Sequence, residues 1–141
     1  MKKLLLPLMF VMLTFGTAVA GSYNYINPDE FKGWLESGKP MIIVDIQVAD
    51  EFKQHHFKNS IETNAYPVDT DEQRKQIDKG VEAFKQTGQE VVVICPRGGG
   101  GAKKCYDYLK ENGVPKEKLL ILKGGVQKWP YQELLEKTAA N

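Results

Sequence analysis

One stretch of this sequence, residues 90–102, holds the residue types that can do covalent chemistry. Its cysteine, Cys95, directly follows the β-branched run Val91–Ile94, which predicts a short strand buried on both faces. From about Ala102 the apolar residues recur with the spacing of an amphipathic helix. Between strand and helix lies a glycine-rich loop, which consists of Pro96, Arg97, Gly98, Gly99, Gly100 and Gly101.

A strand, a glycine-rich loop and a helix in this order are typical of a site that binds an anion. Glycine tolerates positive φ, so loop amides can point inward, and the helix N-terminus adds partial positive charge. We expect the amides of Gly98–Gly101 to bind the anion. We expect the Cys95 thiol to ionise more easily than a free thiol and to act as a nucleophile. Arg97 either supplies a cation to the site or faces solvent.

Other residues of reactive types have structural explanations. Cys105 lies on the apolar stripe of the predicted helix, and we interpret it as a buried small hydrophobe rather than a redox partner. Asp45 interrupts an apolar strand, where we favour a structural hydrogen-bond acceptor over a role in the site. His55 and His56 are adjacent, so they cannot share one face, and no third ligand stands nearby. The sequence therefore predicts no metal site, and it implies no cofactor.

Strand and helix patterns alternate along the chain. The predicted strands are Tyr23–Ile26, Met41–Ile46, Ile61–Ala65, Val91–Ile94 and Leu119–Leu122. The predicted helices are one from the Asn27 cap to Gly38, one over Ala49–Gln54, a long polar one from a Thr70–Gln73 capping box to Gly88, one from Ala102 to Asn112, and a closing one with Trp129, Leu134 and Leu135. This alternation predicts an α/β fold with a mostly parallel five-stranded sheet and helices on both faces.

With these elements placed, the chain resembles the rhodanese-like family of sulfurtransferases. Val44-Asp45 and then Asp50–Phe52 are similar to that family's second strand and next helix. The segment His56–Ile61 is similar to its GHIPGAI segment, and Gly124–Trp129 to its GGWxxW closing motif. Cys95 stands where the family has its catalytic cysteine. The resemblance implies a three-layer α/β fold and a cysteine that carries sulfur.

The loop departs from the usual pattern of that family, which is Cys-x-x-Gly-x-Arg followed by Ser or Ala. Here Ala102 comes one residue late, and the arginine position holds Gly100 or Gly101, depending on the alignment. The loop is thus one residue longer, as in the related cell-cycle phosphatases and arsenate reductases. Those enzymes use Cys-x5-Arg, and that arginine is missing as well.

The resemblance implies transfer of sulfane sulfur through a persulfide on Cys95. The donor would be a small anion such as thiosulfate or polysulfide, and the acceptor a thiol or another protein. A non-catalytic carrier of sulfur or selenium, or a binding domain, is the main alternative. A phosphatase or arsenate reductase is disfavoured because no arginine follows the loop to clamp a tetrahedral oxyanion.

The first twenty residues have the pattern of a secretory signal peptide. Lys2 and Lys3 precede the apolar run Leu4–Phe15, and Ala18-Val19-Ala20 is a small-residue cleavage signal. We therefore expect a signal peptide at 1–20 and a domain at 21–141, periplasmic or secreted, with no stable membrane insertion after cleavage. Lys and Arg total 19 against 18 for Asp and Glu, so the charge offers no reason to expect a nucleic-acid partner.

Export predicts a shortened chain. Protein recovered from the exported fraction of an expressing bacterium is expected to begin at Gly21, which intact-mass measurement checks directly. A recovered chain that still begins at Met1 would contradict the predicted cleavage after Ala20.

Overall fold

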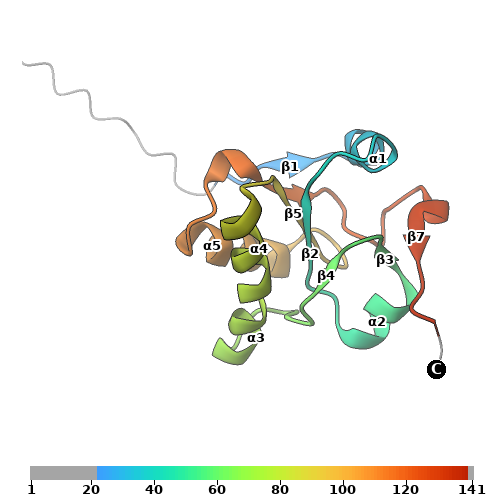
Figure 1. Cartoon of the computed structure of the whole chain (residues 1–141). Coiled ribbons are helices and arrows are strands. Elements are labelled where there is room, and N and C mark those ends of the chain that lie inside the picture. Colours follow the sequence, from blue (N-terminus) through green and yellow to red (C-terminus); the bar gives the residue numbers. More distant parts are fainter. Residues whose placement is uncertain (1–21, 140–141) are drawn as a thin grey trace, which may run out of the picture.

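The computed structural model describes residues 22–139, and the signal peptide predicted at 1–20 lies outside them. The five-stranded sheet is entirely parallel and has the order β1-β6-β5-β2-β4 (Figure 1). Its strands are β1 (Tyr25–Ile26), β2 (Ile42–Asp45), β4 (Ile61–Glu62), β5 (Val91–Ile94) and β6 (Leu119–Leu122). The predicted sheet is confirmed, although β1 and β4 are shorter than the sequence pattern indicated.

Helices cover both faces of the sheet. They are α1 (Pro28–Glu36), α2 (Ala49–Gln54), α3 (Asp71–Gln76), α4 (Asp78–Thr87) and α5 (Gly100–Glu111), with a short 3₁₀ turn, η1 (Lys116–Lys118). In Figure 1, α3, α4 and α5 lie together on one side of the sheet and α1 on the other. Within residues 22–139, no helix is long and apolar enough to cross a membrane.

The central strand β5 divides its side chains between two cores. Val91, Val93 and Cys95 belong to the cluster formed with α4 and α5, whereas Val92 and Ile94 belong to the cluster formed with α1. Successive side chains of a strand point to opposite faces, and burial on both faces selects the β-branched residues seen here. The Cys95 side chain therefore lies on the α5 side of the sheet.

The long polar helix expected after residue 70 is divided in two. Its capping box is confirmed, because the Gln73 amide donates to the Thr70 hydroxyl and the Gln73 side chain accepts from the Thr70 amide, both at 3.2 Å. The helix stops at Ile77, which is fully buried, and α4 then continues in a new direction. The turn brings Gly80 against Val44 of β2, where a Cβ would lie only 2.7 Å from a valine methyl.

The closing helix predicted around Trp129, Leu134 and Leu135 is wrong. Residues 132–134 form one 3₁₀ turn, η2 (Gln132–Leu134), and β7 (Leu135–Glu136) pairs antiparallel with β3 (His56–Phe57). Pro130 lacks the amide hydrogen that a helix needs there. Trp129 is 2% exposed, and the centroid of its ring lies 4.9 Å from that of Phe57. The helix-like spacing of the apolar residues therefore reflects the burial of individual side chains and not a helix.

The loop after β6 packs against the loop after β5 through backbone alone. The Val126 amide donates to the Cys95 carbonyl and the Gln127 amide to the Pro96 carbonyl, each at 3.0 Å. A Cβ on Gly125 would lie 2.4 Å from the Cys95 carbonyl oxygen and 2.6 Å from the Arg97 nitrogen. Only glycine fits at this contact, which holds the Cys95 loop against the sheet.

Gly125→Ala should therefore destabilise the fold far more than Gly88→Ala, a matched control. Both glycines have positive φ, +63° and +64°, but no atom lies within 4 Å of a Cβ built on Gly88. We expect Gly88→Ala to lower the free energy of unfolding by about 1 kcal/mol through backbone strain alone. Gly125→Ala should lower it by about 3 kcal/mol, since the loop backbone must also move. Urea denaturation measures both, and equal losses would contradict the close contact.

Candidate active site

The Cys95 sulfur lies at the end of β5 inside a turn of backbone amides. The Gly98 amide donates a hydrogen bond to Sγ at 2.7 Å, and the neighbouring amides of Arg97 and Gly99 also lower the pKa of this thiol. The residue is only 2% exposed. Three amides that act on one sulfur favour an anion at that atom.

Burial nevertheless raises the pKa of the Cys95 thiol above its ordinary value. Desolvation is the largest cause, the three amides act in the opposite direction, and the negative charge of Asp45 adds to the rise. The expectation that this thiol ionises more easily than a free one is therefore wrong. Of the predicted donors Gly98–Gly101, only Gly98 and Gly99 act on the sulfur, and the sequence pattern did not show how deeply the thiol is buried.

The four glycines of the loop have different roles. Gly98 has a φ of +72°, and a Cβ on it would lie 2.9 Å from the Gly124 nitrogen, so this position requires glycine. Gly99 has open space around it. Gly100 and Gly101 form the first turn of α5, which begins two residues before the predicted Ala102. The four glycines predicted to bind the anion are thus divided between two elements. Gly98 and Gly99 lie in the turn after Cys95, and Gly100 and Gly101 lie at the N-terminus of α5.

Arg97 contributes its backbone to the turn while its side chain is exposed. The amide of Arg97 lowers the pKa of the Cys95 thiol, but within residues 22–139 no carboxylate lies close enough to pair with its guanidinium. The side chain is exposed to solvent, where it stays free to meet an anion that approaches the turn.

Asp45, at the end of β2, is the buried carboxylate of this site. It is fully buried, and its two oxygens accept from the Gln47 amide at 2.8 Å and the Gln47 side chain at 3.0 Å. Burial raises the pKa of Asp45 to about 7 despite these bonds. The structural role is confirmed by the bonds to Gln47, and its charge also acts on Cys95. Sequence reasoning missed Gln47, whose only signal is its place just after the strand.

Cys105 is fully buried one helical turn inside α5, and both cysteines are free. Burial and the nearby Cys95 raise the pKa of the Cys105 thiol. The predicted burial of this residue is confirmed. A thiol with a strongly raised pKa in an apolar cluster is a poor nucleophile.

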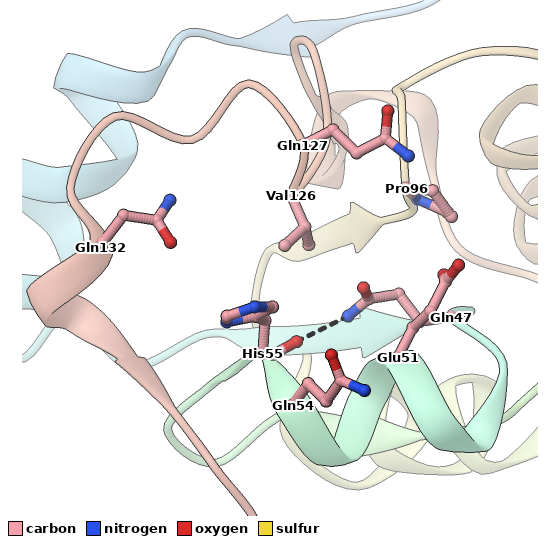
Figure 2. A pocket seen from close by; sticks show the side chains of 8 residues that line it. All are labelled: Gln47, Glu51, Gln54, His55, Pro96, Val126, Gln127 and Gln132. Atoms are coloured by element: carbon pink, nitrogen blue, oxygen red, sulfur yellow. Dashed lines mark hydrogen bonds between the residues drawn. The ribbon is translucent and has the colours of Figure 1, made fainter.

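A polar cavity of about 300 Å³ borders the loop on its other side (Figure 2). Its lining residues are Gln47, Glu51, Gln54, His55, Pro96, Val126, Gln127 and Gln132. Figure 2 shows the Gln47 side chain bonded to the His55 carbonyl oxygen, at 2.8 Å. Val126 belongs to the buried cluster formed with α1, and Cys95 belongs to the buried cluster formed with α4 and α5. The cavity therefore touches the loop through Pro96, while the thiol faces the opposite side of the sheet.

The two adjacent histidines diverge, as their spacing indicated. His55 lines the cavity, whereas the His56 ring stacks on Phe52 with centroids 4.3 Å apart and its Nδ1 bonds the Phe52 carbonyl oxygen. Across residues 22–139, no three His, Cys, Asp or Glu side chains gather in a way that could hold a metal ion.

The sequence matches the family model of the rhodanese-like domain over residues 27–131. The fold is similar to a rhodanese-like domain protein from Staphylococcus aureus, with 24% identity and a TM-score of 0.62 over 82% of this chain and 99% of that one. It is also similar to a yeast protein tyrosine phosphatase of the rhodanese family (16% identity, TM-score 0.66, 84% and 95% covered). A thiosulfate sulfurtransferase from Pseudomonas aeruginosa matches with 16% identity and a TM-score of 0.59, over 83% of this chain and 20% of that one. No functionally curated protein matches the sequence.

The rate of alkylation by iodoacetamide should show the raised pKa of Cys95. The thiolate is the reactive form, so the rate should rise with pH around a midpoint above that of an unfolded cysteine peptide. Asp45→Asn removes the nearby negative charge and should move this midpoint down, on the order of half a pH unit. Cys95→Ser is the control, since Cys105 should stay almost unreactive. A wild-type midpoint below that of the peptide would mean that the amides outweigh burial.

Proposed function

This chain belongs to the family of rhodanese-like domains, and we propose that it is a sulfurtransferase that carries sulfur as a persulfide on Cys95. The observation that carries the proposal is the hydrogen bond from the Gly98 amide to the buried Cys95 sulfur, where the amides of Arg97 and Gly99 also favour negative charge. Such donors stabilise negative charge at a buried sulfur at every stage of a transfer.

The transfer consists of two displacements at sulfur. The Cys95 thiolate attacks the outer sulfur of a sulfane donor, a new S–S bond forms, and the donor's S–S bond breaks with its electron pair leaving on the donor remainder. A thiol or other nucleophile then attacks the outer sulfur of the persulfide, and the bond to Cys95 breaks to return the thiolate. Each step exchanges one S–S bond for another bond to sulfur, so no external oxidant or reductant is needed.

The raised pKa of Cys95 suits such a cycle. Before a donor arrives, the thiol stays protonated and buried, which limits its oxidation. The thiol must release its proton to solvent before it attacks, and the amide donors of the turn then stabilise the thiolate. Asp45, with a pKa of about 7, holds a negative charge near the thiol above neutral pH and a proton below it.

A phosphatase or arsenate-reductase activity has less support. One similar structure is that of a protein named as a tyrosine phosphatase, and the loop from Cys95 to Gly101 has the corresponding length. A tetrahedral oxyanion, however, needs a guanidinium or a comparable clamp. Position 101 is a glycine, and the Arg97 side chain is exposed.

A carrier that only holds sulfur or selenium for a partner would use the same turn of amides.

We also propose that the protein lies outside the cytoplasm, in the periplasm or secreted. This proposal rests on the sequence of residues 1–20 alone. A thiol or protein acceptor and a small anionic donor are the proposed partners. Repeated turnover separates the enzyme from the carrier.

Mass spectrometry of the protein after treatment with polysulfide tests the proposal. We expect the wild type to gain the mass of one sulfur, and excess dithiothreitol to remove it through repeated cycles. Cys95→Ser should take up none, whereas Cys105→Ala should load normally and lose stability on the order of 1 kcal/mol. A folded wild type that never gains sulfur would overturn the proposal, and loading without turnover would favour the carrier.

A further inference from the structure

The ring of Tyr66 lies where a side chain at position 101 would begin. A Cβ built on Gly101 would lie 2.9 Å from Cδ2 and 3.0 Å from Cε2 of Tyr66, and 3.4 Å from Cδ1 of Ile46. Gly101 is the seventh residue counted from Cys95. An arginine at this position would therefore have to displace the ring. The aromatic side chain at position 66 thus requires a glycine at position 101.

The chain around Tyr66 is held in place on both sides. Its amide donates to the Ile46 carbonyl at 2.8 Å, and the buried Val68 donates to the Ala65 carbonyl at 2.8 Å. Asp69 forms an ion pair with Lys104, which lies one helical turn beyond Gly101. The segment 65–69 thus lies along the first turns of α5, which fixes the ring over Gly101.

The ring also lies on the side of the sheet that the thiol faces. Cys95, Ile46, Ala65 and Ala102 belong to one buried cluster, and Tyr66 is the residue next to Ala65. Tyr66 itself is 37% exposed, whereas Cys95 is 2% exposed. The ring is therefore a partly exposed aromatic group, which we call the aromatic wall, over the first turn of α5 on the side of the sheet that the thiol faces.

We propose that Tyr66 is a specificity-determining residue and that the thiol site takes the end of a linear sulfane chain, a polysulfide or an organic persulfide, lying against this ring. The proposal rests on sulfur transfer by Cys95. Divalent sulfur is polarisable and makes favourable contacts with aromatic rings. The tetrahedral sulfonate end of thiosulfate is bulky and charged, and it would meet an aromatic ring instead of a guanidinium.

The reaction at this wall is the first displacement described above. The Cys95 thiolate bonds to the terminal sulfur of the chain, the adjacent S–S bond breaks, and its electron pair leaves on the shortened polysulfide or on the thiolate of the organic donor. The departing group is then a sulfur anion that can withdraw along the ring. Because the reacting end of such a donor consists of sulfur alone, no sulfonate oxygen has to fit beside Tyr66.

Single-turnover loading of Cys95 tests this role. The second-order rate of sulfur uptake is measured by mass spectrometry with tetrasulfide and with thiosulfate, on the wild type, Tyr66→Phe, Tyr66→Leu and Tyr66→Ala. We expect the phenylalanine variant to keep the tetrasulfide-to-thiosulfate ratio within about twofold. The leucine and alanine variants should load tetrasulfide about tenfold more slowly and change little with thiosulfate.

Two further variants separate the ring from charge. Arg97→Ala should slow sulfur uptake from thiosulfate more than sulfur uptake from tetrasulfide. This is the opposite of the pattern expected for Tyr66→Leu and Tyr66→Ala. Combining Gly101→Arg with Tyr66→Ala makes room for a guanidinium and should shift the ratio toward thiosulfate. Circular dichroism and urea denaturation confirm that each variant is folded.

The outcomes distinguish this inference from the proposed function. If Tyr66→Leu slows both donors equally while Cys95 still gains sulfur, the ring selects nothing and the inference fails, but sulfur transfer stands. A wild type that prefers thiosulfate also overturns the inference. If no donor loads the wild type at Cys95, the proposed function fails and the inference fails with it.

Discussion

The site depends on a contact between two backbones. Gly125, at the end of β6, lies against Cys95 and Arg97 at the end of β5, closer than any side chain would allow. Two amide-to-carbonyl bonds at 3.0 Å, from Val126 and Gln127, seal the contact. Because this support leaves the turn little freedom, its amides stay directed at the sulfur without the entropy that a free glycine loop would lose on ordering.

Opposing electrostatic effects meet at the sulfur. Burial in the α5 core disfavours the thiolate, as does the charge of Asp45, and three amides favour it. Burial has the larger effect in the unliganded protein. The same burial makes each amide contact stronger once an anion is present, because water no longer screens it.

The cysteine loop is in contact with a residue from another loop. Position 101 holds a glycine, and the Tyr66 ring lies where a side chain at that position would begin. In our proposal, an aromatic ring takes the place of a guanidinium beside the thiol and leaves the turn of amides unchanged. The segment after β4 would then contribute to specificity together with the cysteine loop.

The sequence by itself determined much of this. The β-branched runs at β2 and β5, the capping box at Thr70 and the glycine-rich loop after Cys95 are local signals, because burial on both faces, cap bonding and positive φ each depend on a few neighbouring residues. They sufficed for the parallel sheet, the place of the thiol and the burial of Cys105.

The tertiary structure decided the rest. The pKa of Cys95 depends on how completely other elements cover it, and the aromatic wall depends on Tyr66 meeting Gly101, residues 35 positions apart that no local pattern connects. Trp129 kept the spacing of a helix but lies in a turn, since Pro130 and the rings of Phe31 and Phe57 determine its place. Spacing along the chain reports which residues are buried; only packing decides what they are buried against.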